Sequence, residues 1–350
     1  METQILGNTD IEVTKLCLGT MMFSTQNSEK GSFEIMDAAV DRGINFLDTA
    51  EMYPIPPKPE NRGHCEALIG RWLKQRGNRD KIVLANKVSG RSKTVRGLPG
   101  DVGHTRLSED RIIPALEKSL QLLQTDCIDL YQVHWPDRPL QLFGANARGY
   151  KHDDSEFESF ESILTTLKKL IEQGKIRAIG VSNETPWGAM SYLAESDKLD
   201  LPRIQSIQNC YHLLNRHYEY GLAEIGMQEN ISLLAYSPLA QGYLTGKYLN
   251  NATPKGSRKA FVGDRLGRYS APSIDIAIKS YLEVAQKFDI DPAEMALRFV
   301  TSRPWTTSAI FGVTNLSQLD TTIRSMDLEW SDELNNTINE VHVRSPNPCP

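Results

Sequence analysis

Short runs of β-branched and aliphatic residues alternate along this chain with segments whose apolar residues recur every three or four positions. The short runs are typical of strands, and the longer period is typical of helices that cover a sheet. Nearly continuous apolar strands favour a parallel sheet with both faces buried. Eight such strands are predicted, at residues 15–18, 45–48, 81–85, 128–133, 176–181, 204–207, 231–235 and 307–310. The pattern predicts an α/β fold, a (β/α)8 barrel.

The clearest helix follows Ser108, a candidate N-cap, and carries its apolar residues at 112, 113, 116, 120 and 123. A second helical period runs from residue 163 to residue 171. Residues 4–6 and 11–13 flank the turn sequence GNTD and predict a hairpin that plugs the bottom of the barrel. Three long polar segments follow strands, at residues 89–107, 136–154 and 250–271. Connections of this length are usually functional, so we expect lids over a site.

Length and composition favour an ordinary globular protein. The 350 residues are 40% apolar and 24% charged, and an α/β barrel of this size forms one domain, here expected to span residues 1–350. The net charge of −5 carries no clustered basic stripe, which argues against nucleic acid as a partner. No leader-like or bilayer-length apolar segment is present, so we expect a cytoplasmic protein without membrane contact. Five cysteines without a C-x-x-C spacing suggest free thiols, and the oligomeric state stays open.

Four polar residues stand at the ends of predicted strands, where a barrel of this kind forms its active site. Asp48 closes one strand, Lys87 and His134 follow two others, and Tyr53 lies five residues beyond Asp48. A carbonyl that accepts hydride develops negative charge on its oxygen and needs a proton donor. Tyr53 is such a donor if a cation stabilises its phenolate, a role for Lys87 held by Asp48. His134 would hydrogen-bond and orient the substrate oxygen.

Each residue also has a structural interpretation. The Asp48–Lys87 pair can be only an ion pair, Tyr53 only packing, and His134 only a satisfied core side chain. The catalytic interpretation rests on the four residues together, because one reaction step accounts for every residue type.

The residues around these positions resemble a known family. Residues 43–53, GINFLDTAEMY, match the signature G-x-N-x-x-D-T-A-x-x-Y of aldo-keto reductases, and the segments ANKV at 85–88 and LYQVHW at 130–135 match the family's lysine and histidine segments. The segment 51–60 and the long loop after His134 are similar to the bacterial Tas-like branch. The resemblance covers essentially the whole chain. It implies reduction of aldehydes or ketones with NADPH, by a complete Asp, Tyr, Lys and His tetrad.

The cofactor would not be bound by a nucleotide motif of the common kinds, because neither G-x-G-x-x-G nor G-x-x-x-x-G-K-[ST] occurs. Barrels often bind phosphate at the loops after the seventh and eighth strands. After the seventh strand, Tyr236 offers a face on which a nicotinamide ring can stack, and small residues follow it. After the eighth, Thr314 or Asn315 can cap a helix and leave amides free for a phosphate. Each loop can equally be a plain connection.

The family resemblance implies more specific roles. Ser182, Asn183 and Gln208 would hydrogen-bond the nicotinamide amide, and residues 236–247 would line the pyrophosphate. Lys247 and Arg258 resemble cations that contact the adenosine phosphates and favour NADPH over NADH. The full set of expected cofactor residues is Thr20, Asp48, Ser182, Asn183, Gln208, Tyr236, Ser237, Pro238, Leu239, Gly242, Thr245, Lys247, Arg258, Gly312, Thr314, Gln318 and Thr322.

The chain departs from the family pattern at two places that bear on the cofactor. Phe311 stands where the family usually has Pro, and Thr321-Thr322 stands where Glu-Asn commonly touches adenine. The adenine contacts are therefore the part of the site that the resemblance specifies least.

Two other functions are compatible with the fold. The first is an NADP(H)-binding sensor or regulatory subunit with little turnover, since potassium-channel β subunits share the fold and the cofactor. The intact tetrad favours the enzyme over this alternative. The second is an aldolase-like barrel in which Lys87 forms a Schiff base. Neither the physiological substrate nor the strength of the NADPH preference follows from the sequence.

Overall fold

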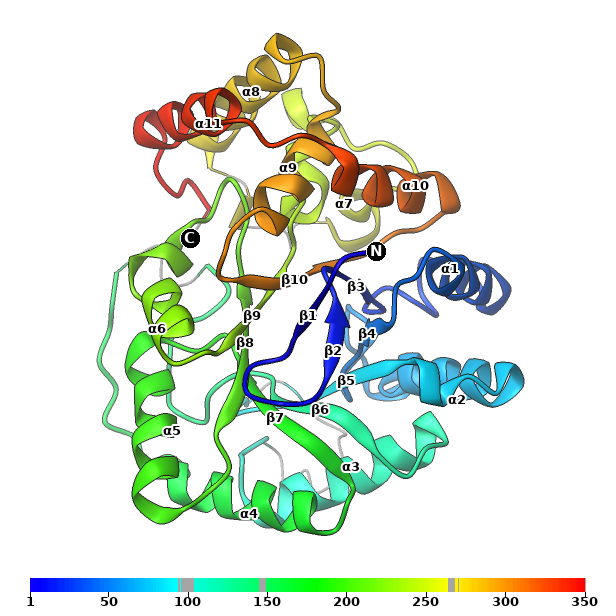
Figure 1. Cartoon of the computed structure of the whole chain (residues 1–350), viewed down its shortest axis with the longest axis vertical. Coiled ribbons are helices and arrows are strands. Elements are labelled where there is room, and N and C mark those ends of the chain that lie inside the picture. Colours follow the sequence, from blue (N-terminus) through cyan, green and yellow to red (C-terminus); the bar gives the residue numbers. More distant parts are fainter. Residues whose placement is uncertain (94, 96–103, 145–148, 264–267, 270, 350) are drawn as a thin grey trace.

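A computed structural model describes the chain except for residues 94, 96–103, 145–148, 264–267, 270 and 350. Eight parallel strands close into a barrel in the order β10-β3-β4-β5-β6-β7-β8-β9, which confirms the predicted fold (Figure 1). The barrel strands are β3 (Leu16–Gly19), β4 (Phe46–Asp48), β5 (Val83–Val88), β6 (Ile128–Val133), β7 (Ile176–Ser182), β8 (Ile204–Cys210), β9 (Ser232–Tyr236) and β10 (Thr306–Phe311). Pairing of Leu18 with Phe311 joins the first barrel strand to the last.

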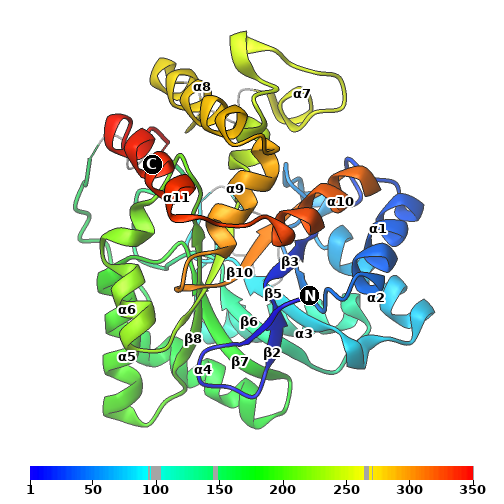
Figure 2. The ribbon, with the colours of Figure 1, turned by 45° about the horizontal axis from the view of Figure 1, so that its top comes forward.

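Helices surround the barrel strands, and Figure 2 shows several of them from a second direction. Their apolar faces explain the period seen in the sequence, because α3 and α4 bury the residues that recur at helical spacing. The helices are α1 (Glu29–Asp41), α2 (His64–Arg76), α3 (Glu109–Leu123), α4 (Phe160–Glu172), α5 (Pro186–Leu199), α6 (Leu222–Gln228), α7 (Arg258–Val262), α8 (Pro272–Lys287), α9 (Pro292–Thr301), α10 (Leu316–Arg324) and α11 (Asp332–Arg344). None of the helices in the described part of the chain has both the length and the apolar content that a membrane crossing needs.

The N-terminal strands β1 (Thr3–Ile5) and β2 (Glu12–Thr14) form the predicted antiparallel hairpin. Leu6, Ile11 and Val13 of this hairpin are fully buried in one cluster with inward-facing barrel residues such as Phe46 and Leu130. The hairpin therefore closes one end of the barrel interior, as expected from the sequence. The other end is left for the loops that follow the strands.

Among the predicted strand ends that differ from the structure, one changes the place of a site residue. The apolar pattern ends a strand at residue 85, whereas β5 continues through Asn86 and Lys87 to Val88. Lys87 thus lies within the strand and not after it. The pattern missed this extension because the last residues of a barrel strand carry polar side chains for the site.

Candidate active site

The tetrad residues meet at the carboxyl ends of three neighbouring strands. Asp48 ends β4, Lys87 is next to the last residue of β5, and His134 follows β6 directly. The barrel register aligns Asp48 with Ala85 and Val88 with Val133, which brings these ends to one level. Tyr53 reaches the same place from the loop after β4. The structure therefore brings together all four residues that the sequence singled out.

Lys87 and Asp48 form a buried ion pair. The Lys87 Nζ lies 2.6 Å from Asp48 Oδ1 and donates a second hydrogen bond to the carbonyl oxygen of Thr49 at 2.8 Å. The other carboxylate oxygen of Asp48 accepts from Gln208 Nε2 at 2.9 Å. Burial lowers the pKa of Lys87, and the Asp48 charge acts against that lowering. The carboxylate keeps a cation in a place without water.

Tyr53 lies over this pair and against the histidine. Its ring centroid is 5.1 Å from Lys87 Nζ and 5.6 Å from the His134 ring, at an interplanar angle of 82°. Burial and the nearby Asp48 charge raise the pKa of Tyr53 well above the usual phenol value. This direction differs from the one expected for a phenol beside a lone cation, because burial and the Asp48 charge both favour the neutral phenol. Tyr53 therefore holds its proton at neutral pH.

His134 is neutral in this environment. Burial, with a smaller contribution from Lys87, lowers its pKa well below the usual imidazole value. Its ring Nδ1 is buried without a hydrogen-bond partner among the described residues. The backbone is fixed on both sides, since His134 N donates to Val88 O at 2.8 Å and Asn183 Nδ2 donates to His134 O at 2.9 Å. A neutral imidazole held in this way can donate one hydrogen bond to a substrate oxygen.

The residues expected to bind the nicotinamide amide form one connected group beside the tetrad. Tyr236 OH donates to Asn183 Oδ1 at 2.7 Å, and Asn183 Nδ2 also lies 3.1 Å from Ser182 Oγ. Ser182 Oγ donates to the carbonyl oxygen of Gln208 at 2.7 Å, and Gln208 binds Asp48. The group is therefore continuous with the Lys87–Asp48 pair. Its amide and hydroxyl groups include both hydrogen-bond donors and hydrogen-bond acceptors.

The segment after β9 turns sharply next to this group. Ser237, Ala240, Gln241 and Gly242 all adopt left-handed backbone angles, with φ of 59°, 48°, 57° and 98°. The buried Gln241 Oε1 has no partner among the described residues. The residues of this segment that were expected to contact the cofactor lie in this turn or in the short helix Ala240–Thr245 that follows it. They are Ser237, Pro238, Leu239, Gly242 and Thr245.

The two expected phosphate-binding cations both lie in the segment after β9. Lys247 is exposed, and its Nζ is 5.2 Å from the Tyr248 ring centroid. Arg258 is partly buried, has Nη2 3.7 Å from Met21 Sδ, and its buried Nε has no described partner. Burial lowers the pKa of Arg258, and the nearby tyrosines oppose this. Arg258 has no acidic partner among the described residues, and its role in phosphate binding stays a prediction.

Helix α10 begins as the sequence suggested. Asn315 is its N-cap and accepts from Gln318 N at 3.0 Å, while Thr314 N donates to Gln318 Oε1 at 2.9 Å. Gly312 is exposed, and a Cβ there would meet nothing closer than Gly19 O at 3.8 Å. The backbone at this point is therefore open to a ligand.

Two of the expected cofactor residues have their hydroxyls engaged within the protein. Thr20 is fully buried and donates from both Oγ1 and N to the carbonyl oxygen of Asp48, at 2.9 and 3.0 Å. Thr322 is also buried, and its Oγ1 donates to Gln318 O inside α10. Thr20 holds the Asp48 backbone in place. A role of either residue in cofactor binding stays a prediction.

Sequence reasoning did not assign a buried pair that supports the Tyr53 loop. Glu51 Oε1 accepts from Arg111 Nη2 and from Ser89 N, each at 2.6 Å, and the Glu51 and Arg111 side chains are almost fully buried. The pair ties the loop after β4 to α3 and to the end of β5. The sequence did hold two signals of this pair. Glu51 lies two residues before Tyr53, and Arg111 lies on the apolar face of α3.

The loop after His134 packs toward the site through two aromatic rings. Trp135 lies 4.8 Å from His134 between centroids and donates from Nε1 to Arg91 O at 2.8 Å, and Phe143 contacts Trp135 edge-on at 6.2 Å. A Cβ at Gly90 would fall 1.8 Å from the Trp135 carbonyl oxygen, so this close approach of the two loops requires glycine.

The protein is thus a closed (β/α)8 barrel whose strand ends carry a buried Asp-Lys pair, a tyrosine and a histidine. A family model described as the aldo/keto reductase family matches residues 15–343, and the chain belongs to that family of oxidoreductases. It is 46% identical to Protein tas of Escherichia coli strain K12 over the full length of both chains.

More distant relatives are consistent with this membership. The chain is 32% identical to the uncharacterized oxidoreductase YrpG of Bacillus subtilis, over 97% of this chain and 96% of that protein. It is 27% identical to the aldo-keto reductase yakc [NADP(+)] of Schizosaccharomyces pombe, over 99% of this chain and 92% of that protein. The likeness to Protein tas agrees with the bacterial branch indicated by the loops.

Proposed function

We propose that this protein reduces aldehydes or ketones to alcohols with NADPH, and that Tyr53 is the proton donor. The observation that carries the proposal is the contact of Tyr53 with both Lys87 and His134 at the carboxyl ends of the strands. Lys87 is in turn paired with Asp48. The overall reaction consumes a carbonyl compound, NADPH and one proton and yields an alcohol and NADP⁺.

When bound, NADPH supplies the hydride that goes to the carbonyl carbon. Tyr53 keeps its hydroxyl proton in the resting site and transfers it to the substrate oxygen as that oxygen becomes negative. Lys87 then stabilises the phenolate that remains, because its charge lies 5.1 Å from the ring centroid. Neutral His134 donates a hydrogen bond to the same oxygen and fixes its direction.

The choice of NADPH is supported by charge. Neither Lys247 nor Arg258 has a carboxylate partner among the described residues. A 2′-phosphate supplies the missing anion, whereas NADH offers none at that place. The name of the yeast relative specifies NADP(+), which agrees with this preference.

The decisive experiment follows NADPH oxidation in the presence of an aldehyde. We expect continued turnover, whereas a sensor with little turnover would consume one equivalent of NADPH per protein or less. In Tyr53→Phe the rate should fall by about 10²- to 10⁴-fold, while NADPH affinity changes by no more than a few-fold. A Tyr53→Phe variant with wild-type activity would refute the mechanism.

The Schiff-base alternative is disfavoured by the state of Lys87. A nucleophilic lysine must be uncharged, but this ammonium donates to Asp48 and to the Thr49 carbonyl at once. Borohydride treatment with a carbonyl compound should leave no adduct on the protein. Mass spectrometry of the treated protein checks this expectation.

A further inference from the structure

Arg268 lies beside residues of the candidate active site and has no assigned role. It comes at the end of the 250–271 insertion and is partly buried. Its guanidinium carbon lies 5.7 Å from the Phe143 ring centroid, and the Tyr236 hydroxyl and the Cys210 thiol lie close enough to interact with its charge. These neighbours come from the ends of β8 and β9 and from the loop after β6, so three separate segments meet at this side chain.

The contacts of Arg268 lead to His134 by two routes. On one side Phe143 packs on Trp135, which packs on His134. On the other side Tyr236 binds Asn183, whose amide binds the His134 carbonyl oxygen. The guanidinium therefore lies near the reacting end of the site. Lys247, in contrast, faces Tyr248, and the open backbone at Gly312 belongs to the loop after β10.

A rigid support holds the chain at this point. Leu214 N donates to His212 Nδ1, which places the ring proton on Nε2, 3.4 Å from the hydroxyl of Tyr269. Tyr269 also stacks on Tyr243, with centroids 4.8 Å apart. Because Tyr269 is the next residue after Arg268, these contacts fix the backbone from which the guanidinium extends.

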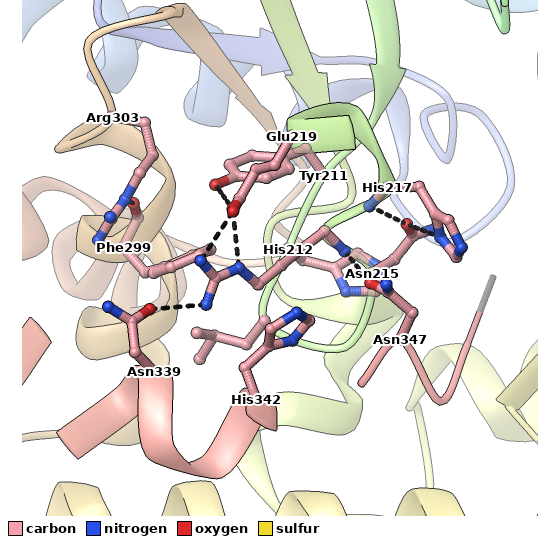
Figure 3. A network of polar contacts seen from close by, with 12 residues as sticks. Tyr211, His212, Asn215, His217, Glu219, Phe299, Arg303, Asn339, His342 and Asn347 are labelled. Atoms are coloured by element: carbon pink, nitrogen blue, oxygen red, sulfur yellow. Dashed lines mark hydrogen bonds and ion pairs between the residues drawn. The ribbon is translucent and has the colours of Figure 1, made fainter. Parts of the chain in front are cut away.

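The loop that carries His212 is braced in turn by the network in Figure 3. Arg216 pairs with Glu219 at 2.7 Å and donates to Asn339 of α11 at 2.8 Å, and its backbone N donates to Asn347 Oδ1 at 2.6 Å. The C-terminal segment thus locks the loop after β8 against α11. Preorganisation of this kind is what a binding residue requires.

The charge of Arg268 is not balanced within the described part of the chain. Three other buried cations near the site each have a carboxylate partner: Lys87 has Asp48, Arg111 has Glu51, and Arg138 has Glu184. Among the described residues, Arg268 has the Cys210 thiol and the Tyr236 phenol beside it and no acidic side chain. Burial raises the pKa of Cys210 to about 11 and raises that of Tyr236 further, so both partners are uncharged at neutral pH. A partly buried cation among neutral groups is completed by an anionic ligand.

We propose that Arg268 binds a carboxylate of the carbonyl substrate, so that the preferred substrates are aldehydes or ketones that also carry an acid group. This inference rests on the proposed reductase function. A guanidinium can hold a carboxylate through two parallel hydrogen bonds, and its position near His134 leaves the carbonyl at the tetrad. Ring contacts of Phe143 and Trp135 connect the guanidinium to His134.

The test compares two aldehydes that differ in one charge, 4-carboxybenzaldehyde and its methyl ester. The wild-type protein should prefer the acid in kcat/KM by about 10- to 100-fold, mainly through a lower KM. In Arg268→Gln the ratio of acid to ester should fall close to one, while NADPH affinity stays within about threefold. Arg268→Lys keeps the charge without the paired donors and should retain part of the preference. Lys255→Met, an exposed cation of the same insertion, is the matched control and should keep the wild-type ratio.

Several outcomes would overturn the inference. Equal use of acid and ester by the wild type would do so even if Arg268→Gln does not fold. Equal losses for both aldehydes in Arg268→Gln, or a parallel loss of NADPH affinity, would assign Arg268 to structure or to the cofactor. If the wild type reduces neither aldehyde, the proposed function fails. Binding of 4-(hydroxymethyl)benzoate, read from Trp135 fluorescence, then tests the anion site alone: binding that Arg268→Gln abolishes supports it, and absence of binding refutes it.

Discussion

Burial sets the protonation state of each titratable side chain around Tyr53. The same loss of water that keeps His134 neutral also keeps Tyr53 protonated, while Lys87 stays charged only through its contact with Asp48. Replacement of one of these side chains is therefore expected to shift the pKa of the others. Removal of the Asp48 carboxylate, for example, would leave a buried ammonium unpaired, which is strongly destabilising.

Glu66 of α2 shows the same effect outside the reaction itself. It is 1% exposed, accepts a hydrogen bond from Asn86 Nδ2 at 2.8 Å, and burial raises its pKa from 4.5 to about 7. A raised pKa contributes stability that is complete below pH 4.5 and is lost as the pH rises through about 7. We expect the free energy of unfolding to fall by roughly 2 to 3 kcal/mol between pH 5 and pH 8 from this group.

Urea unfolding of Glu66→Gln at both pH values checks this expectation. The amide keeps an acceptor for Asn86 and cannot ionise, so the variant should lose less stability than the wild type as the pH rises. Glu224→Gln, on the exposed side of α6, is the control and should follow the wild type. The same pH dependence in Glu66→Gln and wild type would contradict the assignment.

At the scale of elements, the segment from the end of β9 through α7 carries the two cations that the proposed cofactor needs. Lys247 precedes the insertion, and Arg258 begins α7 within it. We expect neutralisation of both, as Lys247→Met with Arg258→Met, to weaken NADPH binding far more than NADH binding. Each charge-assisted hydrogen bond is worth about 1.5–3 kcal/mol, and only NADPH offers the 2′-phosphate. Fluorescence titration with both cofactors measures the difference, and equal losses would refute the assignment.

The loop after β6 is the element expected to shape the substrate pocket. Of the segment 136–154, residues 145–148 lie outside the described part, and Phe143 is the described residue that packs on Trp135. Phe143→Ala, or a shortened loop, should change the ranking of aldehydes and ketones and leave NADPH binding intact, because the cofactor segments follow other strands. Tyr150→Ala, whose ring is 78% exposed, is the matched control. An unchanged ranking in a folded, shortened variant would make the loop a surface insertion only.

Across the whole molecule, the two ends of the barrel serve different purposes. The hairpin end is packed with apolar side chains, and the opposite end holds the polar site. Leu6→Ala should therefore reduce the free energy of unfolding by about 2–5 kcal/mol, because it opens a cavity under the barrel, and the folded variant should keep its activity. Ile5→Ala, at a neighbouring position with 52% exposure, should cost less than about 0.5 kcal/mol. Similar losses from both variants, measured by urea unfolding, would argue against the plug.

Most strands followed from local sequence. Ile128–Val133 was predicted with its observed bounds, because Ile128, Leu130 and Val133 make the run mostly apolar and the polar residues Asp126 and His134 flank it. Local pattern failed where strands enter the site. β5 and β8 run on through Asn86-Lys87 and Gln208-Asn209, since barrel geometry continues while the side chains turn polar for function.

The sequence by itself determined the order of strands and helices, the four tetrad residues and the segments that follow the seventh and eighth strands. It could do so because periodicity and motif spacing are local properties of the chain. Only the tertiary structure decided that Asp48 offsets the charge of Lys87, and that Glu51 and Arg111 pair behind Tyr53. The same holds for Arg268, which stands beside Phe143, Tyr236 and Cys210 without a described acidic partner. Those facts depend on distances between residues far apart in the chain, and on the burial that closure of the barrel imposes on them.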